Sequence, residues 1–189
     1  MTYFISDLHF GHENILRLDK RPFSSIKEHD EELIKRWNAK VKPGDTVYIL
    51  GDFIWKTYDQ TPEELLKSLN GQKILIKGNH DRWINGRTKK YLAAIKDYDD
   101  IKVKLEDGTE KRCILSHYPI HFYNGQYKGS IMLYGHVHIT KDSKLVTDYA
   151  DYLNEQGCPV NMYNVGCMLE YMNYCPRTLD EILKGANNE

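Results

Sequence analysis

Short apolar runs alternate along the chain with segments whose apolar positions recur at helical spacing. Runs of strand-like composition lie at residues 2–5, 46–50, 73–77, 101–105, 112–116, 131–134 and 162–165. In the first half, helical segments separate these runs, which predicts βαβ units. In the second half, the stretch IKVKLEDGTEKRCILS turns at Asp107-Gly108 and predicts a β-hairpin. We therefore predict an α/β fold with mixed sheets.

The expected helices are marked by side chains that cap a helix start. Ser25 with Glu28 has the spacing of a capping box, in which two side chains satisfy free backbone N–H groups. Thr61-Pro62-Glu63-Glu64 marks a second helix start, and Thr178 with Glu181 opens a short C-terminal helix. Two further helices are expected within 88–97 and within 143–155. The polar segment 139–160 lies between two predicted strands, so it is a possible insertion that packs over one sheet edge.

Length and composition limit the class of protein. A chain of 189 residues corresponds to a single domain, taken here as 1–189 with the possible insertion. Its 41% hydrophobic and 28% charged residues are ordinary for a soluble protein. With 26 basic and 27 acidic residues, the net charge is close to zero. This balance disfavours a dedicated nucleic-acid-binding module or attraction to an anionic membrane.

The N-terminal stretch MTYFISDLHF has no basic region followed by a long apolar run, so we do not expect a signal peptide. No segment approaches the roughly 18 apolar residues that a membrane-spanning helix needs. We expect a cytoplasmic protein. The four cysteines form no CxxC pair, which favours reduced thiols over disulfides or a zinc site.

Polar side chains follow five of the predicted strands at the point where each strand ends. In open α/β sheets, ligands bind beyond the carboxyl ends of the strands, so we expect these side chains to converge there. They are Asp7 and His9, Asp52, Asn79 within GNHD, His117, and His136 with His138.

The spacing within these motifs has a geometric meaning. In an extended chain, residues i and i+2 point the same way, so Asp7 and His9 can face one point. His136 and His138 can do the same if their segment is extended, and they could serve different ions if it turns. Glycines directly before several of these groups would let the backbone turn sharply: Gly51, Gly78 and Gly135.

Two carboxylates, four imidazoles and one amide oxygen form a donor set without thiolates. Such a set suits Mn²⁺, Fe or Zn²⁺. Seven side chains are too many for one tetrahedral ion, and they suit two ions about 3.5–4 Å apart. Asp52 is the best candidate for a bridging ligand, because a carboxylate has two oxygens. Each motif is weak alone, and the specificity comes from their occurrence together and in order.

These residues resemble the calcineurin-like metallophosphoesterase superfamily. Its pattern of Asp-x-His, Gly-Asp, Gly-Asn-His-Asp, His and Gly-His-x-His is matched in order between residues 6 and 138. The stretch 164–166 resembles the strand that closes this fold. SDLHFGHENI, followed by RPF, looks like a compact bacterial and phage subgroup. The resemblance implies a four-layer α/β/β/α sandwich with a two-metal centre at one edge.

The resemblance also implies roles for individual residues. One ion would be held by Asp7, His9, Asp52 and His138, and the other by Asp52, Asn79, His117 and His136. His80 would face the substrate as general acid while a metal-bridging hydroxide attacks phosphorus. Asp81 is expected to orient His80 through a hydrogen bond. The protein would then be a two-metal-dependent phosphoester hydrolase, with manganese the favoured metal.

One departure from the superfamily bears on the substrate. Its protein phosphatases have GDxxDRG, whereas this chain has GDFIWK, with Trp55 in place of the second aspartate. A phosphoprotein phosphatase is therefore disfavoured. We expect substrate contacts from His12, Asn14 and Arg82. The aromatic loop 118–129 either stacks a base or packs as a wall of the site.

Three functional hypotheses follow. The first is a phosphodiesterase acting on a small nucleotide-like diester. The second is a phosphomonoesterase or a nuclease on the same centre, although the neutral charge argues against a dedicated nuclease. The third is a non-catalytic scaffold that binds a partner protein. Such a scaffold is expected to have lost His80 or a metal ligand, and this chain retains them all.

Overall fold

The computed structural model describes residues 1–56 and 60–186, which form two four-stranded sheets. The first sheet is parallel throughout and has the order β1 (Thr2–Ile5), β2 (Thr46–Ile49), β3 (Gln72–Ile76) and β4 (Ala94–Lys96). The second has the order β5 (Tyr98–Lys104), β6 (Glu110–Ser116), β7 (Ile131–Tyr134) and β8 (Met162–Asn164). Only β5 and β6 are antiparallel, as the hairpin prediction required. The predicted mixed character therefore belongs to the second sheet alone.

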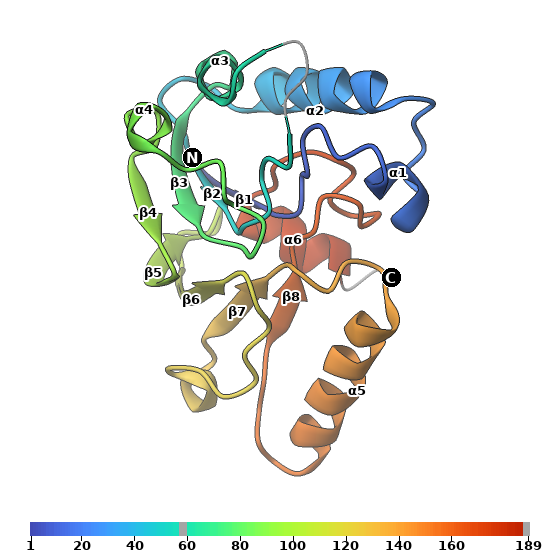
Figure 1. The fold of residues 1–189 in the computed structure, drawn as a ribbon. Helices are drawn as coiled ribbons and strands as arrows, with labels where there is room; N and C mark the ends of the chain where they lie inside the picture. Colours follow the sequence, from blue (N-terminus) through green and yellow to red (C-terminus); the bar gives the residue numbers. More distant parts are fainter. Residues whose placement is uncertain (57–59, 187–189) are drawn as a thin grey trace.

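Helices flank the pair of sheets. Figure 1 shows α2 (Ile26–Lys40) and α3 (Pro62–Ser68) on one side, and α5 (Lys141–Glu155) on the other, near β7 and β8. α6 (Leu179–Ala186) contacts both β1 and β8. The short α1 (Ile15–Leu18), α4 (Gly86–Lys89) and the 3-10 turn η1 (Gln126–Lys128) lie in connections. This is the predicted α/β/β/α arrangement. In the described ranges, none of the helices has both the length and the apolar character needed to traverse a bilayer.

The main core lies between the two sheets and beneath α2 and α3. It includes Phe4, Ile49 and Leu75 from the first sheet, and Leu115 and Leu133 from the second, all fully buried. Strands covered on both faces need apolar residues at nearly every position, which explains the continuous apolar runs.

A second, smaller cluster covers the outer face of the second sheet. Ile114 of β6 and Met132 of β7 pack there with Leu153 of α5. Segment 139–160 was expected to cover a sheet edge. Instead, its helix packs on a sheet face, because Ile114 and Met132 form a register pair whose side chains share that face.

The two sheets are joined beyond the ends of β1 and β8. The Ser6 amide donates to the Val165 carbonyl at 2.8 Å, and the Cys167 amide donates to the Ser6 carbonyl at 2.9 Å. Both strands lie at sheet edges, so this join brings the carboxyl ends of the two sheets together. The segment at 164–166 thus closes the fold as expected.

Two of the three predicted helix starts carry complete capping boxes. In each, the Thr61 or Thr178 hydroxyl accepts from the backbone N–H three residues on, and the glutamate there accepts in return from the threonine N–H. At the start of α2, Ser25 accepts from the Glu28 amide, but the Glu28 carboxylate accepts from Ser24. That capping box is therefore half formed.

The helix predicted within 88–97 is wrong for most of its length. α4 ends at Lys89, and residues 94–96 form β4. The segment YLAAIK has ordinary helical propensity, but β3 offers it an open edge, and Ala94 to Lys96 pair with Ile74 to Ile76. Tertiary pairing outweighs the local preference here.

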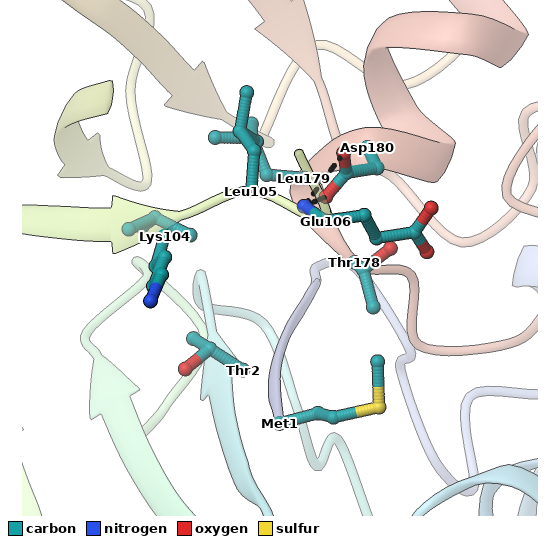
Figure 2. Close-up of a pocket in the computed structure, with 9 residues that line it drawn as sticks. Met1, Thr2, Lys104, Leu105, Glu106, Thr178, Leu179 and Asp180 are labelled. Atoms are coloured by element: carbon teal, nitrogen blue, oxygen red, sulfur yellow. Dashed lines mark hydrogen bonds between the residues drawn. The ribbon is translucent and has the colours of Figure 1, made fainter. Parts of the chain in front are cut away.

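A cavity of about 330 Å³ lies near the start of β1, where the loop after β5 meets α6 (Figure 2). The Glu106 amide donates to both oxygens of the Asp180 carboxylate, at 3.2 and 3.3 Å. Met1 and Thr2 line the same cavity. Because it adjoins the amino end of β1, it is separate from the polar groups that follow the strand.

Candidate metal centre

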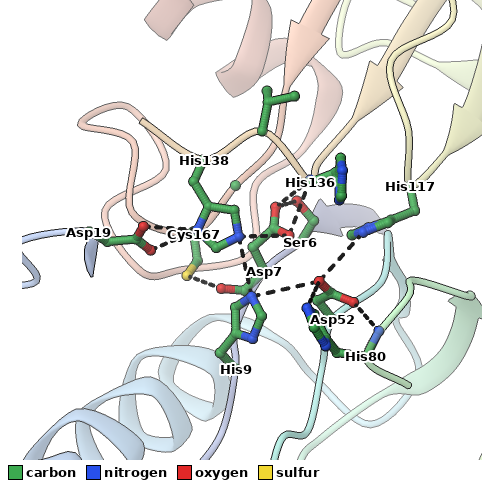
Figure 3. A network of polar contacts seen from close by, with 12 residues as sticks. Ser6, Asp7, His9, Asp19, Asp52, His80, His117, His136, His138 and Cys167 are labelled. Atoms are coloured by element: carbon green, nitrogen blue, oxygen red, sulfur yellow. Dashed lines mark hydrogen bonds and ion pairs between the residues drawn. The ribbon is translucent and has the colours of Figure 1, made fainter. Parts of the chain in front are cut away.

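Six of the predicted ligands gather in two groups beyond the carboxyl ends of β1, β2, β6 and β7 (Figure 3). Within each group, the potential ligand atoms lie within 4.8 Å of one another. The first group is Asp7, His9 and His138, and the second is Asp52, His117 and His136. The Oδ1 atom of Asn79, after β3, lies 3.1 Å from His117 Nε2. The structure therefore brings together all seven predicted ligands.

Asp52 lies between the two groups. Its Oδ2 atom is 3.5 Å from His117 Nε2 in its own group and 3.7 Å from His9 Nε2 in the other. The carboxylate is almost fully buried. A bridging ligand between two cations would occupy this position.

The donor atoms also fit cations chemically. His9 Nε2 and His138 Nε2 are 3.2 Å apart, and His9 Nδ1 is buried without a hydrogen-bond partner in the described part of the chain. Imidazole nitrogens and carboxylate oxygens this close together suit shared coordination of a Mn-, Fe- or Zn-type ion.

The backbone that carries these ligands is not extended. Five of them have left-handed backbone conformations that non-glycine residues seldom adopt: Asp7 (φ 55°), His9 (φ 51°), Asp52 (φ 51°), His136 (φ 72°) and His138 (φ 48°). Each such residue costs on the order of 1–3 kcal/mol, and such strain clusters at functional sites. The extended conformation predicted for Asp7 and His9 is therefore wrong, whereas the turning alternative for His136 and His138 agrees with the structure. Asp7 and His9 share a group through turns, and His136 and His138 fall in different groups.

Two glycines before ligands are required for different reasons. Gly51 adopts φ 85°, which is the sharp turn expected from the sequence. Gly78 has no such conformation. A Cβ there would lie 2.3 Å from Asp52 Oδ1 and 2.6 Å from the Asp52 amide. Gly78 is thus required by the close approach of Asp52, rather than by a turn.

Hydrogen bonds aim two of the imidazoles. His117 Nδ1 donates to the Leu50 carbonyl at 2.8 Å, and His138 Nδ1 donates to Asp19 at 2.9 Å. Each bond turns Nε2 toward the candidate metal position and fixes the tautomer that leaves Nε2 free.

Asp19 belongs to a buried network that sequence reasoning did not assign. The Arg21 side chain is fully buried and donates to the Asp19 carboxylate and to the carbonyls of Asp7 and Leu8. It also donates to His29 Nε2 at 2.9 Å. Arg21 is the first residue of the RPF stretch noted in the sequence, and that stretch is the sequence feature that could have pointed to this network. One guanidinium thus holds both the backbone of the Asp7 loop and the partner of His138.

Asp81 has a different structural role from the one expected. Its carboxylate accepts from the amides of Asp52, Phe53 and Gly78, at 3.0, 2.9 and 2.8 Å, and from the Trp83 indole. In the described residues, no hydrogen bond joins it to the His80 ring. The reason is geometric: Asp81 is buried beneath the loops, whereas the His80 side chain is 36% exposed. Asp81 therefore positions the loops that carry Asp52 and Gly78.

Burial and charge set the protonation of the centre. Burial, with the charge of nearby His138, lowers the pKa of His9 to about 2. Burial opposes ionisation of Asp52, but the hydrogen bond and charge of His117 outweigh it and lower the pKa of Asp52 to about 2. Burial likewise opposes protonation of His117, but Asp52 and Asp7 raise its pKa to about 9. A positive charge is thus favoured beside Asp52, and a bound cation supplies one.

The expected substrate-contacting residues differ in their placement. Arg82 is exposed and lines a cleft of about 470 Å³ together with His80, Trp55 and Trp83. His12 stacks on Trp55, with ring centroids 4.1 Å apart. Asn14 is exposed at the start of α1, and its side chain makes no capping hydrogen bond.

The aromatic loop 118–129 contributes one residue to the centre. The Tyr118 ring lies 4.6 Å from the His136 ring and is 46% exposed, so it forms a wall there. Phe122 and Tyr127 are more exposed still, and Tyr123 is buried in the smaller core. Trp55 is 47% exposed and is therefore not a core residue.

Comparison with known proteins gives the family. The sequence pattern of the family described as calcineurin-like phosphoesterase matches residues 2–155. The chain belongs to this family. The relatives of this calcineurin-like phosphoesterase include MJ1445, a protein of Methanocaldococcus jannaschii, which is 34% identical over 183 residues covering 96% of this chain and 89% of that protein. Gene 66 protein of Mycobacterium phage L5 is 30% identical over 163 residues covering 72% of this chain and 77% of that protein.

A solved structure shows a similar fold. The crystal structure of the protein of unknown function AQ665 from Aquifex aeolicus superposes with a TM-score of 0.71 at 31% identity, covering 97% of this chain and 98% of that chain. The family prediction is confirmed. This calcineurin-like phosphoesterase is a metal-dependent hydrolase of phosphoric esters, with a centre for two divalent metal ions.

Proposed function

We propose that this calcineurin-like phosphoesterase is a phosphodiesterase that acts on a small nucleotide-like diester, with Mn²⁺ as its metal. The observation that carries this proposal is the position of His80 outside the two ligand groups. Its Nε2 atom lies 4.0 Å from Asp52 Oδ2, and its side chain is 36% exposed. A group at this place faces both the centre and the approaching substrate.

Each residue then has a defined task. When bound, the two cations activate water and neutralise charge on the phosphoryl oxygens. Seven side chains would hold these cations: Asp7, His9, Asp52, Asn79, His117, His136 and His138. A water oxygen forms the new bond to phosphorus as the bond to the leaving oxygen breaks. His80 donates its Nε2 proton to the leaving oxygen, and the water proton passes to solvent.

The replacement of GDxxDRG by GDFIWK disfavours a phosphoprotein phosphatase and therefore favours a diester over a monoester. A cleft of about 470 Å³ is lined by His80, Arg82, Trp55 and Trp83. A monoester places only one organic group at the centre. A diester places two there, and the cleft has room for the one that leaves.

The test is turnover of bis-p-nitrophenyl phosphate beside p-nitrophenyl phosphate, with Mn²⁺, Zn²⁺ or EDTA. We expect Mn²⁺-dependent cleavage of the diester, lost in Asp52→Asn and retained in Asp148→Asn, an exposed aspartate on α5. His80→Ala should lower the turnover of an alkyl diester about 10²–10⁴-fold. The same variant should lose less turnover of p-nitrophenyl esters, because p-nitrophenolate leaves without needing a proton.

Two results would count against the proposal. Preference for the monoester would identify a phosphomonoesterase. An equal loss of turnover in His80→Ala for esters with alkyl and p-nitrophenyl leaving groups would contradict the role of His80 as the general acid.

A further inference from the structure

We infer that the cleft beside His80 is a seat for an aromatic ring on the leaving group, with Trp55 as the stacking surface. This inference rests on the proposed function, since the group that receives the His80 proton is the leaving group. Whatever leaves must therefore occupy the space next to His80. The walls of that space then report the chemistry of the leaving alcohol.

The indole of Trp55 is exposed and yet fixed in place. The Trp55 amide donates to the Phe10 carbonyl at 3.0 Å, which anchors the backbone. His12 stacks against the ring at an interplanar angle of 11°, and the His80 ring lies 4.7 Å away at 55°. Trp55 nevertheless remains 47% exposed, and the part of it that His12 and His80 do not cover lines the cleft. A cleft beside a reaction centre that is lined by aromatic side chains is typical of a ligand-binding surface.

The other walls suit a planar ring as well. Trp83 is half-buried, and its indole N–H donates to Asp81 Oδ1 at 2.8 Å, which fixes its orientation. The exposed Arg82 guanidinium completes the lining. Two indoles and a guanidinium are the groups that stack on nucleobases, and stacking tolerates any base because every base has a π face. The positive charge of Arg82 disfavours a cationic leaving group.

The leaving group is thus a nucleoside-like alcohol that carries a flat aromatic ring. An aliphatic alcohol of equal size would fill the cleft but would gain less from stacking. This difference distinguishes a ring-specific seat from a generally apolar one.

The experiment compares two methyl phosphodiesters with matched leaving alcohols, benzyl alcohol and cyclohexylmethanol, on the Mn²⁺-loaded protein. Trp55→Leu should lower kcat/KM for release of benzyl alcohol about tenfold or more relative to release of cyclohexylmethanol. Trp55→Phe should restore most of the loss. Tyr152→Leu changes a similarly exposed aromatic on α5 and should leave kcat/KM for both substrates unchanged.

A binding measurement separates this inference from the proposed function. Titration calorimetry of the Mn²⁺-loaded protein should detect adenosine but not ribose, and Trp55→Leu should weaken adenosine binding about tenfold or more. Equal losses of kcat/KM for both alcohols, or adenosine binding unchanged in Trp55→Leu, would overturn the ring seat while leaving the phosphodiesterase intact. If no ester is cleaved but adenosine binding depends on Trp55, the proposed function fails and the ring seat stands.

Discussion

At the scale of single residues, the centre depends on conformations and spaces that the residue types barely indicate. Five ligands sit at positive φ, and Gly78 leaves room for Asp52. The cost of that strain is offset by hydrogen bonds such as those from the Gly78 and Asp52 amides to Asp81. Such a site tolerates little added volume.

Gly78→Ala should therefore impair the centre strongly. The new methyl group would meet Asp52 at 2.3 Å, so Asp52 must move, at a cost of about 1–3 kcal/mol in stability. We expect weaker binding of Mn²⁺, measured by calorimetry, and lower phosphodiester turnover. Gly44→Ala is the matched control, because a Cβ at Gly44 meets nothing within 4 Å. Unchanged Mn²⁺ affinity in Gly78→Ala would show that the close approach is not required.

At the scale of elements, a buried polar network ties α2 to the turn that follows β1. His29 of α2 donates to Asp30 at 2.7 Å and accepts from Arg21, and Asp30 accepts from the Gly11 amide. Arg21 in turn pairs with Asp19, with both side chains almost fully buried. Removing one partner of such a pair leaves a buried charge without compensation.

Arg21→Met should accordingly destabilise the protein by about 3–5 kcal/mol in denaturant unfolding. Arg112→Met makes the same change in an ion pair with Asp100 whose arginine side chain is 44% exposed. That pair should be worth less than about 1 kcal/mol. Similar losses in the two variants would contradict the role assigned to the buried network.

At the scale of the whole molecule, the helices on the two sides of the sandwich bury different numbers of side chains. α2 buries His29, Leu33 and Trp37 against the main core, whereas α5 buries only Leu153 among its residues, against the smaller cluster. An element with few buried apolar contacts opens at lower free energy than one in the main core.

Amide hydrogen exchange should therefore be at least about tenfold faster in α5 than in α2. Leu153→Ala should speed exchange in α5 further and leave α2 unchanged. Leu145→Ala, on the same helix but at a residue that is 64% exposed, should leave the exchange rates of both helices unchanged. Equal protection of both helices would mean that the smaller cluster unfolds together with the main core.

The sequence by itself determined the fold class, most strand positions and the set of candidate ligands. Apolar runs, capping residues and the Asp107-Gly108 turn act over a few residues, so they can be read locally. The family motifs placed the seven candidate ligands at strand ends, where the topology gathers them. Local signals were insufficient at 94–96, because an open edge of β3 made that segment a strand.

Only the tertiary structure decided how the gathered groups are used. His136 and His138 fall in different groups, whereas Asp7 and His9, which also have left-handed backbone, share one, and no spacing rule shows this difference. The Asp81 carboxylate accepts hydrogen bonds from three backbone amides and not from the His80 ring. Two of those amides belong to Asp52 and Phe53, which lie 29 and 28 residues earlier in the chain. Arg21 and Asp19 joined the centre through contacts with Asp7 and His138. Side-chain direction depends on φ and on partners distant in sequence, and both are fixed only when the two sheets meet.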